Sequence, residues 1–280
     1  DQRYAEFRNH DISSHASRSV LDLALEDHVG ERKDKTEKNI DPRFKKWLII
    51  QLRLFFFVGH DSTSPTICYC YYMLSKNDAA LEKIRQEHDI GRGTVFGTEL
   101  SQVSRALVEQ PQLLNQLPYT IAVIKETLRL FPPASGFRAG NPGVYLEGDS
   151  GKRYPTADTR VWVLHSGLHR NPKYWKAPNT FLPERWLVGP EDPLYPMKGA
   201  WRAFEHGPRN CLGQAMAMLD LKITLVMTVR LFDFRDAYKE WDKLHPTTRV
   251  NKFRGERAYQ VGSGGAHPAD AFPCFVSLHR

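Results

Sequence analysis

The chain has 280 residues, of which 41% are hydrophobic and 25% are charged, and its formal net charge is +7. A chain of this length buries one sizeable core or two small ones. Its basic residues are scattered among acidic ones rather than gathered in runs, which argues against nucleic-acid binding, although the positive charge suits an acidic protein partner.

Two helices are predicted in the first part of the chain. Residues 1–40 are polar and mixed in charge, and the segment Ser17–Asp27 within them has amphipathic helical spacing. Asp41 and Pro42 then predict the beginning of a long helix, because aspartate caps helices and proline suits the first turn. We expect this second helix to continue to Leu74.

The long helix is predicted to be the buried central helix of the fold, because apolar residues occur on most of its sides. Its most apolar stretch, Trp47 to Val58, is interrupted by Arg53. A membrane-spanning helix needs about 20 apolar residues, so we expect a core helix here rather than a membrane span.

The middle of this helix is chemically unusual. Residues 59–65 read Gly-His-Asp-Ser-Thr-Ser-Pro, which places a carboxylate, hydroxyls, a glycine and a proline inside a helix. In a helix interior, glycine costs about 1 kcal/mol and proline about 3 kcal/mol relative to alanine. Pro65 also cannot donate a hydrogen bond to the Asp61 carbonyl, which predicts a local kink. A purely structural helix rarely keeps so many penalties together, and we therefore interpret the segment as functional.

Three further helices are predicted downstream. The segments Ala79–Asp89, Ser101–Glu109 and Pro118–Leu130 each have helical spacing of their apolar residues. Glu126 and Arg129 lie at i, i+3 on one face of the last helix. Such pairs are commonly exposed and contribute little stability, so the pair alone carries no conclusion.

Strand signals follow. The segment Val144–Val163 alternates and turns through Glu147–Gly151, which predicts two short hairpin strands. His165 and His169 come next at i, i+4, but no third ligand accompanies them, so a zinc site is not favoured. The segment Asn171–Ala203 is rich in Pro, Trp and Tyr, which predicts an irregular segment held by packed tryptophans.

The C-terminal tail is predicted to form a hairpin. It starts with an alternating pattern, turns through the glycine-rich residues 262–265, and ends in Phe275–Leu278. No repeat, low-complexity segment or linker divides the chain, so residues 1–280 are predicted to form one unit.

The four cysteines, Cys68, Cys70, Cys211 and Cys274, fit neither a disulfide framework nor a zinc-binding Cys-x-x-Cys pair. Cys68 and Cys70 lie at i, i+2 in a helix and therefore point in different directions. We expect reduced thiols in a cytosol-facing compartment.

One cysteine occupies a special position. Residues 204–213 read Phe-Glu-His-Gly-Pro-Arg-Asn-Cys-Leu-Gly and directly precede an apolar run, Leu212–Val229. This run has helical spacing, which places Cys211 at a helix N-terminus, where free N–H groups and the helix dipole stabilise a thiolate. The residues predicted to share one buried face are Leu212, Ala215, Met216, Leu219, Ile223 and Val226.

The neighbours of Cys211 suit a large anionic group. Gly207 and Gly213 let the backbone approach something large and flat, or bend sharply. Arg209 supplies a fixed positive charge. The alternative that these residues leave open is a buried structural cysteine before a core helix.

The pattern Phe-x-x-Gly-x-Arg-x-Cys-x-Gly resembles the haem-ligand loop of the cytochrome P450 superfamily, and Ala217 extends the match. The resemblance implies that Cys211 is the proximal thiolate ligand of a haem b iron. It also implies that Phe204, Gly207, Arg209 and Gly213 help to form the haem site. Glu205 departs from the small or histidine residue common at its position, and we assign it no role.

The segment Val58–Thr63 resembles the oxygen-activating helix of the same superfamily. The resemblance implies that Asp61 and Ser62 deliver protons on the distal side of the haem. Ser62 stands where the family usually has threonine, which keeps the hydroxyl but loses the methyl group that fixes its rotamer. Thr63 is expected to form a hydrogen bond back to the helix. The less favoured alternative is that Thr63 takes over the proton-delivery role of Ser62.

Three further landmarks occur in family order. Glu126-x-x-Arg129 and the Arg185 of Pro-Glu-Arg resemble the pair and its third partner that form a buried triad in the family. The implied role of the triad is to hold the loop that carries Cys211, with no direct part in the chemistry. Arg138 stands where the family places an arginine on a haem propionate, the alternative being an exposed loop arginine.

Together these landmarks resemble the C-terminal part of the cytochrome P450 fold, which is mainly α with small β-hairpins. Residues 1–280 are then expected to form a single, partial haem-binding domain. The implied function is a haem-thiolate monooxygenase that inserts one oxygen atom of O2 into an apolar small molecule. Electrons would come from NADPH through a reductase. The amino-acid sequences of the motifs resemble those of fungal members of the superfamily that act in secondary metabolism.

The family resemblance also sets expectations for location and for rival functions. A full-length form is expected at the cytosolic face of the endoplasmic reticulum membrane through an N-terminal anchor that has no counterpart before residue 1. One alternative is a truncated, catalytically silent haem-fold fragment. Another is an isomerase or dehydratase that needs no reductase, against which Asp61 and Ser62 argue.

Overall fold

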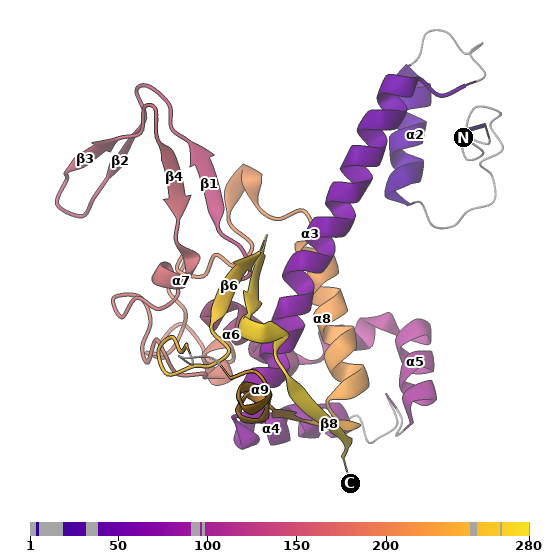
Figure 1. Cartoon of the computed structure of the whole chain (residues 1–280), viewed down its shortest axis with the longest axis vertical. Helices are drawn as coiled ribbons and strands as arrows, with labels where there is room; N and C mark the ends of the chain where they lie inside the picture. Colours follow the sequence, from indigo (N-terminus) through magenta and orange to yellow (C-terminus); the bar gives the residue numbers. More distant parts are fainter. Residues whose placement is uncertain are drawn as a thin grey trace. The chain divides into compact units, whose positions relative to one another are not determined.

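The computed structural model of the chain describes residues 4–5, 19–31, 39–90, 96, 99–246, 251–263 and 265–279. These residues belong to two compact units, 1–60 and 61–280, with helix α3 contributing to both (Figure 1). The described part of the first unit is helical, and the second unit combines helices with short antiparallel strand pairs, so the predicted fold class is confirmed. Whether residues 1–280 act as one haem-binding domain stays a prediction.

The first unit contains helix α2 (Val20–Glu31) and the beginning of α3 (Pro42–Ser75). Ser19 caps α2, because its Oγ accepts a hydrogen bond from Asp22 N at 3.2 Å and Asp22 Oδ2 accepts one from Ser19 N at 3.0 Å. This box sets the start of the helix a few residues later than the sequence predicted. The predicted cap of α3 is confirmed, since Asp41 Oδ1 accepts from Arg43 N at 2.8 Å.

The prediction that α3 is buried throughout is wrong for its first half. Trp47, Phe56 and Val58 are 52%, 79% and 48% exposed, whereas Tyr69 and Leu74 are almost completely buried. A helix that is apolar on most sides needs packing partners on most sides. Along α3, the described residues provide such partners mainly for its second half. The helix passes through Pro65 as one element.

The main core of residues 61–280 is formed by the second half of α3 and four of the helices that follow it. The helices after α3 are α4 (Asp78–Ile90), α5 (Leu100–Glu109), α6 (Pro118–Leu130), α7 (His165–Leu168), α8 (Gln214–Thr228) and α9 (Tyr238–Leu244). Short 3-10 helices are η2 (Pro111–Asn115), η3 (Pro183–Trp186), η4 (Gly207–Arg209) and η5 (Ala269–Ala271). The helices predicted at α4, α5 and α6 are confirmed.

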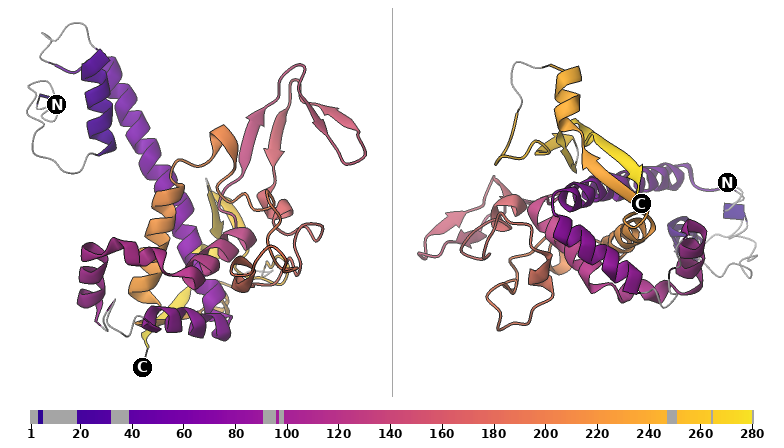
Figure 2. Two further views of the ribbon diagram at one scale, coloured as in Figure 1. Left: turned by 180° about the vertical axis from the view of Figure 1, so that it is seen from behind. Right: turned by 90° about the horizontal axis from the view of Figure 1, so that it is seen from below.

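The strands form antiparallel pairs. Strands β2 (Tyr145–Glu147) and β3 (Arg153–Pro155) make the predicted hairpin, which projects away from the helices (Figures 1 and 2). Strand β1 (Gly136–Ala139) pairs with β4 (Arg160–Val163). These pairs bring Arg138 and the start of α7 toward the same part of the unit.

The C-terminal tail differs from the predicted single hairpin. Strands β6 (Gln260–Ser263) and β7 (Gly265–Pro268) form the hairpin, but β8 (Cys274–Leu278) pairs with β5 (Phe232–Asp236). The sequence could not show this because β5 lies outside the tail. The last strand is therefore anchored beside the end of α8 rather than folded back on β7.

Two buried histidines predict acid sensitivity of the fold. His88 in α4 and His169 after α7 are fully buried, and burial lowers the pKa of each to about 3. His88 Nε2 lies 2.8 Å from Thr120 Oγ1. Its Nδ1 has no hydrogen-bond partner among the described residues, so nothing there would stabilise a second N–H on the ring. Both rings therefore stay neutral in the folded chain while they protonate in the unfolded chain.

We expect each neutral histidine to make its full contribution to the free energy of unfolding above the unfolded pKa of 6.5 and to lose it as the pH falls toward 3. At pH 5 the free energy of unfolding is then lower by about 2 kcal/mol per histidine than at pH 7. Urea unfolding at the two pH values measures this decrease, and His88→Leu should make the decrease smaller by about 2 kcal/mol. An unfolding free energy that is equal at the two pH values would contradict this prediction.

Candidate functional site

The cysteine loop, residues 204–213, connects the irregular segment to α8. Its two ends are held together, because Cys211 N donates a hydrogen bond to the Phe204 carbonyl at 2.9 Å. The turn η4 lies between them and begins at Gly207, whose φ of +76° favours glycine. Cys211 is exposed, so the alternative of a buried structural cysteine is wrong.

The thiol of Cys211 lies just before α8. The N-cap of the helix is Gly213, and Gln214 N donates to the Cys211 carbonyl at 3.4 Å. A Cβ added to Gly213 would lie 3.8 Å from Cys211 Sγ. Glycine therefore leaves one flank of the sulfur free of side-chain atoms.

The face of α8 that was predicted to be buried is largely exposed. Leu212, Met216 and Leu219 are 92%, 70% and 42% exposed, whereas Val226 on the same predicted face is buried, together with Leu221 and Leu225. The exposed residues lie in the first half of the run and the buried ones in the second half, and helical spacing alone cannot tell which part of an apolar run is covered. The result is an exposed apolar helix face adjoining an exposed thiol.

Two exposed arginines accompany the loop. Arg209 ends η4, and Arg138 lies in β1, where its Nη1 donates to the Phe137 carbonyl at 2.7 Å. Neither forms an ion pair with the part of the chain that the structure describes. Phe204 is half-buried and packs edge-on against Trp201, with ring centroids 6.0 Å apart.

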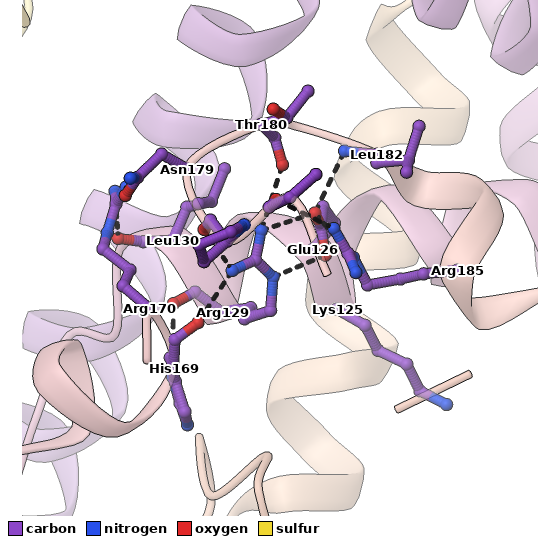
Figure 3. Close-up of polar contacts among 12 residues, drawn as sticks. Lys125, Glu126, Arg129, Leu130, His169, Arg170, Asn179, Thr180, Leu182 and Arg185 are labelled. Atoms are coloured by element: carbon purple, nitrogen blue, oxygen red, sulfur yellow. Dashed lines mark hydrogen bonds and ion pairs between the residues drawn. The ribbon is translucent and has the colours of Figure 1, made fainter. Parts of the chain in front are cut away.

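Glu126 is the centre of a buried charged cluster (Figure 3). Arg129 binds it with two hydrogen bonds of 2.8 and 2.9 Å, and Arg185 Nε donates to the same carboxylate at 3.1 Å. Further donors are Trp186 Nε1 and Leu182 N, each at 3.0 Å. The structure thus brings together the three residues that the sequence grouped, all completely buried.

The same arginines tie α6 to the irregular segment. Arg129 Nη1 donates to the carbonyls of His169 and Pro178, both at 2.7 Å, and its Nη2 donates to Thr180 O at 3.0 Å. His169 accepts a hydrogen bond from Arg202 N through Nε2 at 2.9 Å. A continuous set of contacts therefore leads from Glu126 to the residues just before the cysteine loop.

Glu205, to which the sequence assigned no role, is the polar anchor of this loop. Its Oε2 accepts from Arg202 Nη2 at 2.5 Å, and its Oε1 lies 2.8 Å from His165 Nε2. Burial alone would raise the pKa of Glu205, but hydrogen bonds from His165 and Arg202 hold it below its usual range. His165 Nδ1 lies 2.8 Å from the Ala134 carbonyl, so the ring also connects the loop to the segment before β1.

Gly136 in β1 makes room for this anchor. A Cβ at position 136 would collide with Glu205 Oε1. We expect Gly136→Ala to displace the carboxylate from its partners and to lower the free energy of unfolding by about 1–3 kcal/mol. Urea unfolding measures this change.

A matched control is Gly189→Ala, because a Cβ there meets nothing within 4 Å. A double-mutant cycle with Glu205→Ala should show that Gly136→Ala costs less once the carboxylate is absent. Equal costs for Gly136→Ala and Gly189→Ala would show that Glu205 is not constrained.

The three residues proposed for proton delivery lie in α3. Asp61 Oδ1 lies 2.9 Å from His267 Nε2, and its Oδ2 accepts from Gly265 N. The Ser62 carbonyl accepts from Thr66 Oγ1 at 2.8 Å, and Thr63 is buried. The sequence shows the glycine-rich turn, but no local pattern predicts its contact with Asp61.

Comparison with known proteins identifies the family. The family model for cytochrome P450 matches residues 2–254. The chain belongs to the cytochrome P450 family. It is 45% identical over 267 residues to "Cytochrome P450 monooxygenase polC" of Polytolypa hystricis, covering 94% of this chain and 47% of that protein.

Two further relatives of this cytochrome P450 chain are also fungal. It is 31% identical over 281 residues to "Cytochrome P450 monooxygenase acrF" of Aspergillus aculeatus, covering 92% of this chain and 55% of that protein. It is 36% identical over 222 residues to "Cytochrome P450 monooxygenase ptmG" of Penicillium ochrochloron, covering 79% of this chain and 39% of that protein. The chain thus spans about half the length of these relatives or less.

The residues present fit the haem that a cytochrome P450 carries. An exposed thiol suits iron, and the open flank at Gly213 and the apolar face of α8 suit a flat macrocycle. Arg138 and Arg209 form no ion pair with the described residues, and their charges suit carboxylates. Among the described residues, no helix is both long enough and apolar enough to cross a membrane.

Proposed function

We propose that this chain is the haem-thiolate part of a fungal cytochrome P450 monooxygenase that inserts one oxygen atom of O2 into an apolar small molecule. The observation that carries the proposal is the exposed Cys211 thiol in a closed loop, directly before an exposed apolar face of α8. The relatives are named cytochrome P450 monooxygenases, and the activity proposed here is that of the whole protein.

The chain's own residues would divide the work of holding the haem. Cys211 would bind the iron as a thiolate, Arg209 and Arg138 would bind the haem carboxylates, and Phe204, Gly207 and Gly213 would shape the loop. A thiolate-ligated haem supplies the activation of dioxygen for insertion into a C–H bond. The Glu126, Arg129 and Arg185 cluster would keep the loop in position through His169 and Arg202.

The distal residues would handle protons. The Asp61 carboxylate accepts and releases a proton, and the neighbouring Ser62 hydroxyl can pass it on. Thr63 would serve this purpose only if Ser62 does not. The hydrogen bonds that fix Asp61 support this role, because a proton carrier must be held in a defined orientation.

The partners follow from the same proposal. Electrons would come from NADPH through a flavoprotein reductase, and a net charge of +7 suits an acidic partner surface. The substrate would be an apolar compound of fungal secondary metabolism, processed at the cytosolic face of the endoplasmic reticulum membrane. The similarity to fungal proteins supports this assignment.

A direct test incubates the haem-loaded protein with NADPH, a fungal reductase, ¹⁸O2 and a panel of apolar polyketides. We expect a product that contains one ¹⁸O atom and forms only with NADPH. Product formation without NADPH would indicate an isomerase or dehydratase instead. A haem-loaded protein that consumes neither NADPH nor oxygen would support the second candidate, a silent fragment, which the exposed first half of α3 favours.

A further inference from the structure

The β6–β7 hairpin makes a specific contact with Asp61. Both carboxylate oxygens are engaged, Oδ2 by Gly265 N and Oδ1 by His267 Nε2 at 2.9 Å. The side chain of Asp61 is 16% exposed and that of His267 is 28% exposed. The pair therefore joins a largely buried acid in α3 to a partly exposed imidazole.

The hairpin is fixed on its other side as well. Ala266 N donates to the Pro133 carbonyl at 2.8 Å, and Gln260 Nε2 donates to the Pro132 carbonyl at 3.0 Å. These two contacts, one from the backbone and one from a side chain, hold the hairpin that carries His267 independently of Asp61.

Gly265 shows how closely the two elements approach each other. A Cβ at position 265 would lie 2.7 Å from Asp61 O and 2.8 Å from Asp61 Oδ2. Only glycine fits this approach without displacing the acid. The short hairpin is thus shaped to hold this carboxylate.

The hydrogen-bond roles of His267 follow from its partner. An ionised carboxylate only accepts hydrogen bonds, so Nε2 carries a hydrogen and donates it to Asp61. Nδ1 has no partner in the described chain, and the ring is partly exposed. One nitrogen therefore meets the buried acid while the other is left for water.

We propose that His267 is the proton-carrying partner of Asp61. A hydronium ion of the solvent gives a proton to Nδ1, and the Nε2–H bond breaks as its proton passes to the Asp61 carboxylate, which leaves the Nδ1–H tautomer. The ring returns to the Nε2–H tautomer when its hydrogen bond to Asp61 opens, Nδ1 releases its proton to water and Nε2 takes one up from water. Asp61 then serves Ser62 as described above. This inference rests on the proposed function, and it adds a residue on the C-terminal hairpin to the proton path.

The chain contains a control pair of the same chemistry. His279 Nδ1 lies 3.1 Å from Asp233 Oδ2, and both side chains are more than 40% exposed. This pair lies between β5 and the end of the chain, outside the proposed site. His279→Gln therefore controls for the loss of a histidine that pairs with an aspartate.

The first experiment needs no haem. In the ¹⁵N-labelled 280-residue chain, NMR should show His267 as the Nε2–H tautomer and a slowly exchanging Gly265 amide. Asp61→Ala should accelerate exchange of the Gly265 amide about tenfold or more. A mixed tautomer in the wild type, or an unchanged Gly265 amide in Asp61→Ala, would overturn the pairing.

The second experiment separates proton transfer from positioning. Glutamine keeps an N–H donor for Asp61 but cannot pass a proton between two nitrogens. With the apolar polyketide that the haem-loaded wild type oxidises fastest, His267→Gln should keep the Gly265 protection. It should nevertheless divert NADPH-derived electrons from product to hydrogen peroxide, with about a tenfold lower product yield per NADPH.

The outcomes are distinguishable. A His267→Gln protein that couples NADPH to product like wild type and like His279→Gln would overturn the relay alone. A wild type that consumes neither NADPH nor oxygen would overturn the proposed function and the relay with it. An equal loss of product yield per NADPH in His267→Gln and His279→Gln would show that the loss comes from a general effect on the fold, and it would also overturn the relay.

Discussion

Replacing Cys211 by alanine is expected to abolish thiolate-type haem binding completely. No other described cysteine can take its place. Cys70 is fully buried, and burial raises the pKa of its thiol to about 12. Burial likewise raises the pKa of Cys68 and Cys274, so the thiolates of all three are disfavoured.

The measurement is haem titration followed by absorption spectroscopy of the reduced, CO-bound protein. The matched control is Cys274→Ala, which removes another exposed cysteine but leaves the loop intact. We expect the control to bind haem like wild type. An unchanged thiolate-type spectrum in Cys211→Ala would refute the assignment of the iron ligand.

Replacing Glu126 by alanine is expected to have the largest effect on stability. The carboxylate binds two completely buried guanidinium groups, and its removal leaves both charges without their anion. Breaking a buried pair in this way costs about 3–5 kcal/mol. Because the cluster holds the residues before the cysteine loop, we expect haem incorporation to fail as well.

Urea unfolding and haem titration measure the two effects of Glu126→Ala. Glu191→Ala is the control, since Glu191 is an exposed acid. Glu126→Gln should fall between the two, because it keeps a hydrogen-bond acceptor but loses the charge. A Glu126→Ala protein that is stable to within about 1 kcal/mol and loads with haem would contradict the supporting role of the cluster.

Local patterns predicted much of the fold correctly. The start of α3 follows from a cap at Asp41, and α6 follows from the spacing of apolar residues between Pro118 and Leu130. Such features depend on residues that are close in sequence, so the sequence carries their signal. The cluster around Glu126 is different, because Arg185 lies 59 residues away and only the resemblance to the family implies that it joins Glu126 and Arg129.

Two errors have a common physical cause. The first half of α3 and the face of α8 around Met216 were expected to be buried, and both are exposed. Each helix is apolar on more than one side, so periodicity cannot choose the buried side. Only the partners that pack against a helix determine this, and they come from distant parts of the chain.

The contacts of Glu205 and Asp61 were missed for a related reason. Glu205 meets His165 across 40 residues, and Asp61 meets His267 across 206 residues. No local pattern joins partners so far apart. The weak signals were Arg202 at i−3 from Glu205 and the glycine-rich turn around Gly265, each of which marks one end of a contact.

The central claim is that the chain holds a haem through Cys211. The most direct measurement is the absorption spectrum of the purified 280-residue chain after haem loading, reduction and exposure to CO. A bound thiolate predicts the strongly red-shifted Soret band of a reduced, CO-bound haem-thiolate protein. No Soret band, or an unshifted band typical of a lost thiolate, would contradict the account.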